Sequence, residues 1–137
     1  PELKLPQHSR EMLSLTFMHN NLLWPAYIPA EPVYEFWSKV EVPFGMADTE
    51  FFPYWTNGIQ TSAPFIKASY WKKSKSEDYL LALSNWSDRP VQAKITLPKP
   101  LSTAKQCIEM ESGTTIPMNL ELTISIPAHD LRVLRLK

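Results

Sequence analysis

Asp48 and Glu50 form a close acidic pair within a run of aromatic residues. The rings on either side of the pair are Phe44, Phe51, Phe52, Tyr54 and Trp55. Hydrolysis of a glycosidic bond uses two carboxyl groups held roughly 5–10 Å apart, and sugar rings stack on aromatic side chains. The pair is therefore a candidate site for contact with a sugar. The alternative is a loop whose rings dock on a core while Asp48 forms local hydrogen bonds.

His19 is a second candidate, because it follows an apolar run over residues 9–24 that fits two structures. A strand over residues 13–18 would place His19 and Asn20 at the carboxyl end of a barrel strand. Barrel enzymes keep their site residues at that end. A buried helix capped by Ser9 would instead make His19 a packed or surface histidine.

Tryptophan and tyrosine side chains form a third candidate set. Two or three such rings exposed in a row make a flat surface on which a sugar can stack. The rings considered for this surface are Trp55, Tyr70, Trp71 and Trp86. Against this, two of the tryptophans lie in strand-like runs with apolar neighbours, which is typical of a core. The predicted substrate contacts are, in all, Trp55, Tyr70, Trp71, His19, Asp48 and Glu50.

Other kinds of catalytic and cofactor site are missing from the sequence. There is no G-x-S-x-G motif, and three scattered glycines cannot build a phosphate loop or a dinucleotide fingerprint. Cys107 is the only cysteine, which excludes an internal disulfide framework and a cysteine-rich zinc site. No two histidines have the spacing of metal ligands. We therefore expect neither a cofactor nor a protein-built metal site.

Charge and length limit the partners of this chain. Its 137 residues include 14 Lys plus Arg and 14 Asp plus Glu, so the formal charge is zero. Nucleic-acid binders and polybasic membrane-surface proteins carry a basic excess. The longest apolar run is far shorter than the ~20 residues of a membrane span. We therefore expect neither nucleic acid nor a membrane as a partner.

The second half of the chain has the patterns of short strands. Residues 91–97 and 120–126 alternate apolar and polar side chains, and residues 78–86 are apolar on both faces. Further strands are predicted at 65–71, 106–110 and 131–136. Turn residues separate them, and no connection has room for a helix. Six to seven strands of this kind predict a mainly β fold, an antiparallel β-sandwich of the Greek-key type.

The first half is less regular and precedes the sandwich as a short helical segment. Residues 31–42 predict a helix, with Pro32 in its first turn and Pro43 after its end. We therefore divide the chain into a helical or irregular segment, residues 1–60, and a sandwich domain, residues 61–137.

Two stretches of the second half resemble the C-terminal β-sandwich of many bacterial glycoside hydrolases. They are DYLLALSNWSDRPVQAKITLPKP, which starts at residue 78, and IPAHDLRVLRLK, which ends the chain. The resemblance covers residues 65–137, about half of the sequence. A further stretch, FGMADTEFFPYW, is similar to segments that link barrel and sandwich in hydrolases near the family 123 glycosidases.

The resemblance implies that the sandwich follows a (β/α)₈ catalytic barrel and is not itself catalytic. Turn and corner positions are implied for Asn85, Trp86, His129 and Arg132. A whole barrel cannot be built from 60 residues, so residues 1–60 would be the tail of the barrel and a linker. The catalytic acids would then precede Pro1. A start at Pro1 without methionine likewise indicates a processed chain or part of a longer one.

We therefore expect a non-catalytic accessory domain that stabilises an upstream catalytic barrel of the same polypeptide and flanks its cleft. Such a chain would be inactive alone, would expose an apolar patch that permits self-association, and would be periplasmic or extracellular. Three alternatives stay open. They are a carbohydrate-binding module with surface aromatics, a protein-interaction sandwich, and an independent catalytic domain that uses Asp48 and Glu50.

Overall fold

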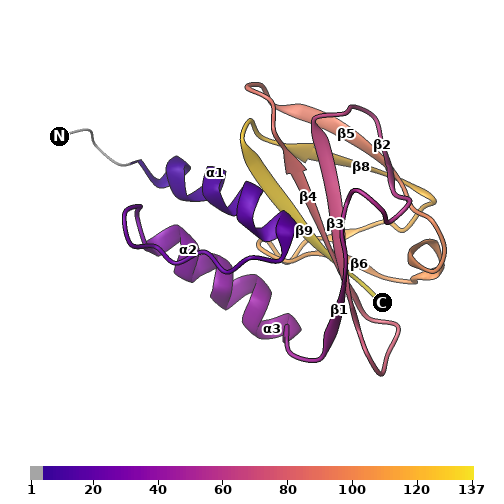
Figure 1. Ribbon diagram of the computed structural model, residues 1–137. Coiled ribbons are helices and arrows are strands. Elements are labelled where there is room, and N and C mark those ends of the chain that lie inside the picture. Colours follow the sequence, from indigo (N-terminus) through magenta and orange to yellow (C-terminus); the bar gives the residue numbers. More distant parts are fainter. Residues whose placement is uncertain (1–4) are drawn as a thin grey trace.

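The computed structural model describes residues 5–137; residues 1–4, at the start of the predicted first segment, lie outside the described residues. Two antiparallel sheets, of six and three strands, pack face to face, and a helical layer covers the outer face of the larger sheet (Figure 1). The predicted fold class, a mainly β sandwich preceded by a short helical segment, is confirmed.

The larger sheet contains the predicted central strand and its neighbours. Its order is β1 (Thr49–Phe52), β3 (Ile66–Lys73), β4 (Tyr79–Asn85), β9 (Asp130–Leu136), β6 (Cys107–Glu109) and β7 (Thr115–Ile116). The smaller sheet has the order β2 (Gln60–Thr61), β5 (Val91–Thr96) and β8 (Glu121–Ile126). β1 lies within residues 1–60 and β2 spans the predicted boundary at residues 60 and 61, and each forms one edge of a sheet.

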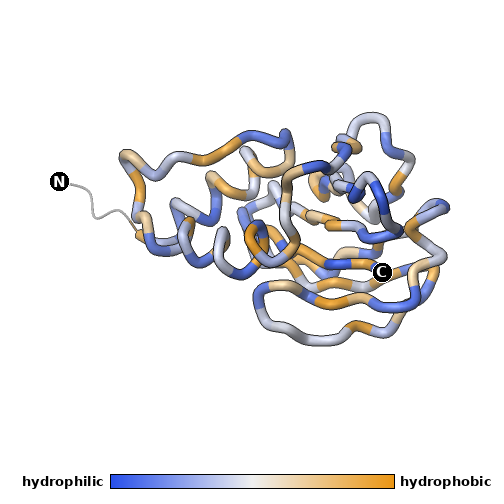
Figure 2. Tube along the Cα trace, turned by 90° about the horizontal axis from the view of Figure 1, so that it is seen from below, coloured by the Kyte–Doolittle hydropathy of each residue, from blue (hydrophilic) through white to orange (hydrophobic). Residues whose placement is uncertain are grey.

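Two-sided burial explains why β4 and β9 are apolar on both faces. Leu81 and Leu134 point into the core between the sheets, whereas Leu80 and Val133 point toward the helical layer. The register between the two strands is continuous, so the apolar residues of β9 on both faces, Val133 and Leu134 among them, reflect burial on both sides and not a bulge. Figure 2 shows the corresponding hydrophobic stretches in the middle of the molecule.

The helical layer consists of two helical runs. The first is α1 (Pro6–Thr16), which continues as η1 (Phe17–His19), a short 3₁₀ turn. The strand alternative for residues 13–18 is therefore wrong. Leu13 and Phe17, one helical turn apart, are both buried against the larger sheet, and this contact selects the helix. Ser9 does not cap the helix; its hydroxyl donates to the main-chain oxygen of Pro29 at 2.5 Å.

The second run is α2 (Glu31–Phe36), η2 (Trp37–Glu41) and α3 (Val42–Phe44). It extends two residues beyond the predicted end and contains Pro43. A proline has no N–H for the helical hydrogen bond, and the π-helical turn of η2 directly before it provides the change in hydrogen bonding that this requires. Gly45, with φ of +77°, ends the run. Among residues 5–137, no helix is long and apolar enough to cross a membrane.

Candidate functional site

The structure distributes the six predicted sugar contacts over four places. Tyr70 and Trp71 are adjacent on β3, so their side chains point to opposite faces of the sheet. Tyr70 is buried between the sheets and stacks on Phe52, with 4.5 Å between ring centroids. Burial and the charge of Glu50 raise the pKa of the Tyr70 hydroxyl. Neither ring lies beside Trp55, so the four rings considered above do not form one flat surface.

Trp71 belongs to the core between the larger sheet and the helices. It is 1% exposed and stacks on Phe17 with 4.5 Å between centroids. Its indole N–H donates to Asn20 Oδ1 at 2.9 Å, which satisfies the polar atom of a buried ring. The side chain therefore joins the first helical run to β3.

Asp48 and Glu50 lie before and within β1, and both are exposed. Asp48 has φ of +61°, and its main-chain oxygen accepts hydrogen bonds from the N–H and the hydroxyl of Ser74. The three phenylalanines on either side of the pair dock on the two cores: Phe44 and Phe51 pack beneath the helical layer, and Phe52 stacks on Tyr70. The acidic pair thus has no aromatic wall around it.

His19 and Trp55 are the two predicted contacts that the structure brings together. With Tyr54 and Trp86 they make a group of four side chains that we term the ring cluster. The His19 ring lies 5.8 Å from Trp55 and 6.2 Å from Trp86, at angles of 27° and 19°. Tyr54 stands nearly perpendicular to the other three rings, with centroids 5.0–5.6 Å away.

Hydrogen bonds fix the orientation of the ring cluster. Nδ1 of His19 lies 2.7 Å from the main-chain oxygen of Leu15 and must donate, because a carbonyl oxygen can only accept. In the neutral imidazole, Nε2 then accepts from the Tyr54 hydroxyl at 3.2 Å. Trp86 donates its indole N–H to the main-chain oxygen of Ser14 at 3.2 Å. Hydrogen bonds therefore fix three of the four rings, His19, Tyr54 and Trp86.

Lys67 is a cation beside the ring cluster that the sequence analysis did not single out. Its Nζ lies 5.3 Å from the centroids of both Tyr54 and Trp86. Within the part of the chain that the structure describes, its ammonium group has no acidic partner. The sequence contained one signal that could have identified Lys67: the period-two pattern of β3 puts it on the same face of the sheet as Ser69 and Trp71.

Ser69 explains how distant segments meet at this cluster. Its hydroxyl accepts from the main-chain N–H of Tyr54 and donates to the main-chain oxygen of Met18, both at 3.0 Å. The residues next to these two partners are Trp55 and His19. One buried hydroxyl on β3 therefore fixes both segments at the same height on the sheet.

Asn85, for which the family resemblance implies a turn position, is the last residue of β4 and borders the turn that follows. It is fully buried, and its amide group donates to the main-chain oxygens of Arg89, Ile126 and Pro127 at 2.8–3.2 Å. Its Oδ1 accepts from the N–H and hydroxyl of Ser87. His129, at the facing corner, has φ of +50° and donates its main-chain N–H to Ser87. Asn85, Ser87 and His129 thus join two turns of the sandwich.

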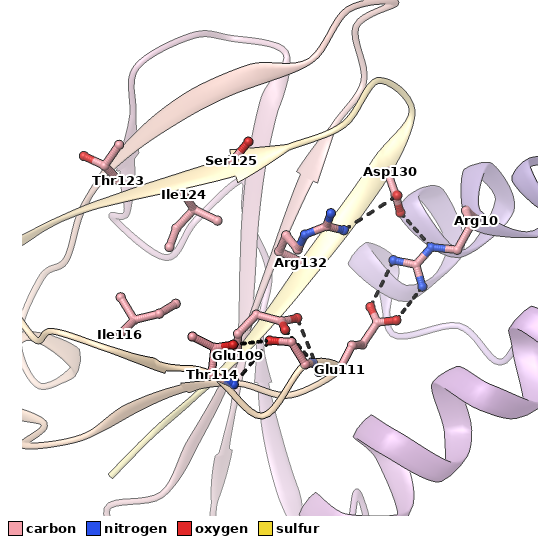
Figure 3. Close-up of a pocket in the computed structure, with 11 residues that line it drawn as sticks. Arg10, Glu109, Glu111, Thr114, Ile116, Thr123, Ile124, Ser125, Asp130 and Arg132 are labelled. Carbon is pink, nitrogen blue, oxygen red and sulfur yellow. Dashed lines mark hydrogen bonds and ion pairs between the residues drawn. The ribbon is translucent and has the colours of Figure 1, made fainter.

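A pocket of about 620 Å³ lies where α1 meets the sandwich (Figure 3). Arg10 contacts both carboxylate oxygens of Glu111, at 2.6 and 2.9 Å, and Asp130 at 2.8 Å. Burial lowers the pKa of Arg10, but Glu111 and Asp130 outweigh this and raise it above its ordinary value. Glu111 and Asp130 thus form ion pairs with Arg10 that hold α1 to the sheet. No group of three His, Cys, Asp or Glu residues within the described chain could hold a metal ion.

Comparisons with known proteins find likeness in structure alone. No family model matches the sequence, and no curated protein matches it. A GH27 β-L-arabinopyranosidase from Geobacillus stearothermophilus matches with a TM-score of 0.65 and 12% identity over 97% of this chain and 30% of that chain. An α-galactosidase I from Mortierella vinacea matches with a TM-score of 0.46 and 15% identity over 54% of this chain and 21% of that chain.

A GH30 endoxylanase from Clostridium papyrosolvens matches with a TM-score of 0.43 and 14% identity, over 59% of this chain and 24% of that chain. The chain thus spans less than a third of each of these proteins. The predicted resemblance to part of a glycoside hydrolase is confirmed at the level of the fold. The narrower likeness to family 123 enzymes is unconfirmed.

Proposed function

We propose that this chain is a non-catalytic accessory region of a glycoside hydrolase, and that it packs against the catalytic domain of the same polypeptide and stabilises it. The observation that carries the proposal is the match to the arabinopyranosidase over 97% of this chain but 30% of that enzyme. The helical layer and the sandwich together resemble one part of a larger enzyme. The division into a barrel tail, residues 1–60, and a sandwich, residues 61–137, and the location outside the cytoplasm belong to the same proposal.

The apolar surface of the helical layer supports the proposal that this layer contacts a large partner domain. Large apolar side chains are exposed on the connection between the two helical runs and along the second run. They are Leu22, Trp24, Tyr27, Tyr34 and Val42, each more than half exposed. Monomeric proteins rarely expose patches of this kind, and such patches usually mark an interface. A catalytic domain on this surface would cover these side chains.

Catalysis by this chain alone has little support in the geometry. Asp48 and Glu50 are exposed, and in the pocket beside α1 Glu111 and Asp130 are paired with Arg10, while Glu109 accepts hydrogen bonds from the main-chain N–H groups of Glu111 and Ser112. We expect no turnover of aryl glycosides by the isolated chain. Activity that copurifies with the chain and disappears in Asp48→Asn would show instead that it is an independent catalytic domain.

The test uses the complete polypeptide that contains this chain. We would measure the melting temperature and the glycosidase activity of the catalytic domain with and without residues 5–137, and in the double variant Leu22→Ser, Trp24→Ser. The proposal expects a lower melting temperature in both. Leu120→Ser is the matched control, because Leu120 is 63% exposed but precedes β8 in the sandwich. Unchanged stability without residues 5–137, or the absence of any further domain in the polypeptide, would overturn the proposal.

A further inference from the structure

We propose that the ring cluster and Lys67 bind one pyranose ring of an oligosaccharide. Trp55 would supply the stacking surface, and the Lys67 ammonium group would donate hydrogen bonds to sugar oxygens. This site is separate from the proposed contact with a catalytic domain, and its test does not depend on that contact.

The stacking step rests on the exposure and the support of Trp55. The side chain is 58% exposed, although its ring packs on His19 and on Tyr54. The face of an aromatic ring is electron-rich, and the C–H groups on one face of a pyranose are apolar and slightly positive, so the two attract each other. Because the neighbouring rings already fix Trp55, little conformational entropy is lost when a sugar binds.

The polar step rests on Lys67. Its ammonium group lies over the faces of Tyr54 and Trp86 and has no acidic partner in the described chain. Three N–H donors are therefore available to hydroxyl or carboxylate oxygens. A pocket of about 150 Å³, lined by Tyr54, Thr61 and Lys67 among others, adjoins this position. The stacking surface and the donor thus both adjoin Tyr54, with the Trp55 centroid 5.0 Å and Lys67 Nζ 5.3 Å from the centroid of its ring.

The composition of the site favours a sugar over a protein partner. The core of a protein interface is depleted in lysine and buries several hundred Å² of surface. The ring cluster instead combines a few ring faces with a histidine, a phenol and an ammonium group. Small-ligand sites have this character, with apolar walls and a few placed polar groups. The helical surface around Leu22 and Trp24, with several large exposed apolar side chains, fits a protein better.

The experiment is calorimetric titration of the purified chain, because the variants remove a fluorescent reporter. The probes are neutral galacto- and xylo-oligosaccharides and, as an acidic arm, oligogalacturonides. We expect saturable binding that weakens about tenfold in Trp55→Ala and severalfold in Lys67→Met. Equal affinity for the neutral and the acidic oligosaccharides would indicate that Lys67 donates hydrogen bonds to hydroxyl groups. A preference for the acidic arm that Lys67→Met removes would indicate a carboxylate.

Matched controls separate this site from a general effect of exposed residues. Trp24 is 73% exposed and lies outside the ring cluster, so Trp24→Ala should bind like the unmodified chain. Lys94→Met on β5 is the corresponding control for charge. Because Trp55 is exposed, its variant should keep the melting temperature of the chain. Absence of binding in both arms, equal affinity in Trp55→Ala, or equal loss in Trp24→Ala would each overturn the proposal.

Discussion

Replacement of Asn85 by alanine should destabilise the sandwich strongly although it removes only a small side chain. The amide group of Asn85 contacts the turn after β4 and the corner between β8 and β9. Alanine removes the donor for three main-chain oxygens and the acceptor for Ser87. Water cannot reach this position, because Asn85 is fully buried.

The size of this destabilisation follows from how deeply each oxygen that Asn85 contacts is buried. The oxygen of Ile126 is in the buried part of the network, and an unsatisfied group of that kind costs about 1–3 kcal/mol. The oxygens of Arg89 and Pro127 are partly buried, and each lost hydrogen bond costs about 0.5–1.5 kcal/mol. The free energy of unfolding should therefore fall by about 2–6 kcal/mol. In a domain of this size, at roughly 4 °C per kcal/mol, that corresponds to a melting temperature lower by about 8–24 °C.

Urea denaturation followed by tryptophan fluorescence would measure this loss, with an unchanged slope as evidence that the unfolding reaction is the same. Asn85→Asp distinguishes hydrogen bonding from volume, because it keeps the size but turns an oxygen toward three carbonyl oxygens. It should destabilise at least as much as alanine. Asn57→Ala, at a half-buried asparagine with a similar turn network, should cost less. The reasoning is refuted if Asn85→Asp is as stable as the unmodified protein, or if Asn85→Ala costs less than about 1 kcal/mol.

Three further predictions concern other buried groups. Arg10→Ala should cost about 2–4 kcal/mol in thermal unfolding, because Glu111 and Asp130 lose their partner, and Arg10→Lys should restore at most half of this. Trp71→Ala should cost about 3–5 kcal/mol and reduce the helical circular dichroism signal, in contrast to the exposed Trp55→Ala. Burial raises the pKa of the Cys107 thiol from 9.0 to about 11, so a disulfide reagent at pH 8 should react with it only after denaturation. The pKa of this thiol is higher in the folded than in the unfolded protein, so its contribution to stability is complete below pH 9. The contribution is lost as the pH rises toward 11, and the free energy of unfolding falls by at most about 1.4 kcal/mol per pH unit. Cys107→Ala should not show this pH-dependent loss.

The strands were predictable where one periodic pattern decides the structure. β5 and β8 alternate cleanly, because one face of each lies on the core and the other in water. β2 and β7 have two residues each, too few for any alternation to be seen. The run over residues 9–24 is apolar nearly all round, so its period does not separate helix from strand. Tertiary contact decided that case, through Leu13 and Phe17 on the outer face of the larger sheet.

The candidate site was predictable only in part, for two different physical reasons. Tyr70 and Trp71 could have been separated from the sequence, because adjacent residues of one strand never share a face. The meeting of His19 and Trp55 could not, since they are 36 positions apart and come together through a third segment. That segment contributes Ser69, whose hydroxyl gives no sign in the sequence that it connects two loops.

The same kind of hydrogen bond explains why the helical layer and the sandwich form one structural unit. The last carbonyl groups of a helix lack partners within it. Near the end of the first helical run, the oxygen of Ser14 accepts from the buried Ser84 hydroxyl at 2.7 Å, and the oxygen of Met18 accepts from Ser69. Two serine hydroxyl groups of the larger sheet thus donate hydrogen bonds to carbonyl groups near the end of the helical run, and these bonds hold the run over the sheet. The ring cluster lies at this junction, so its geometry depends on both layers, and a sandwich without the helices would lose His19 and the oxygen that orients Trp86.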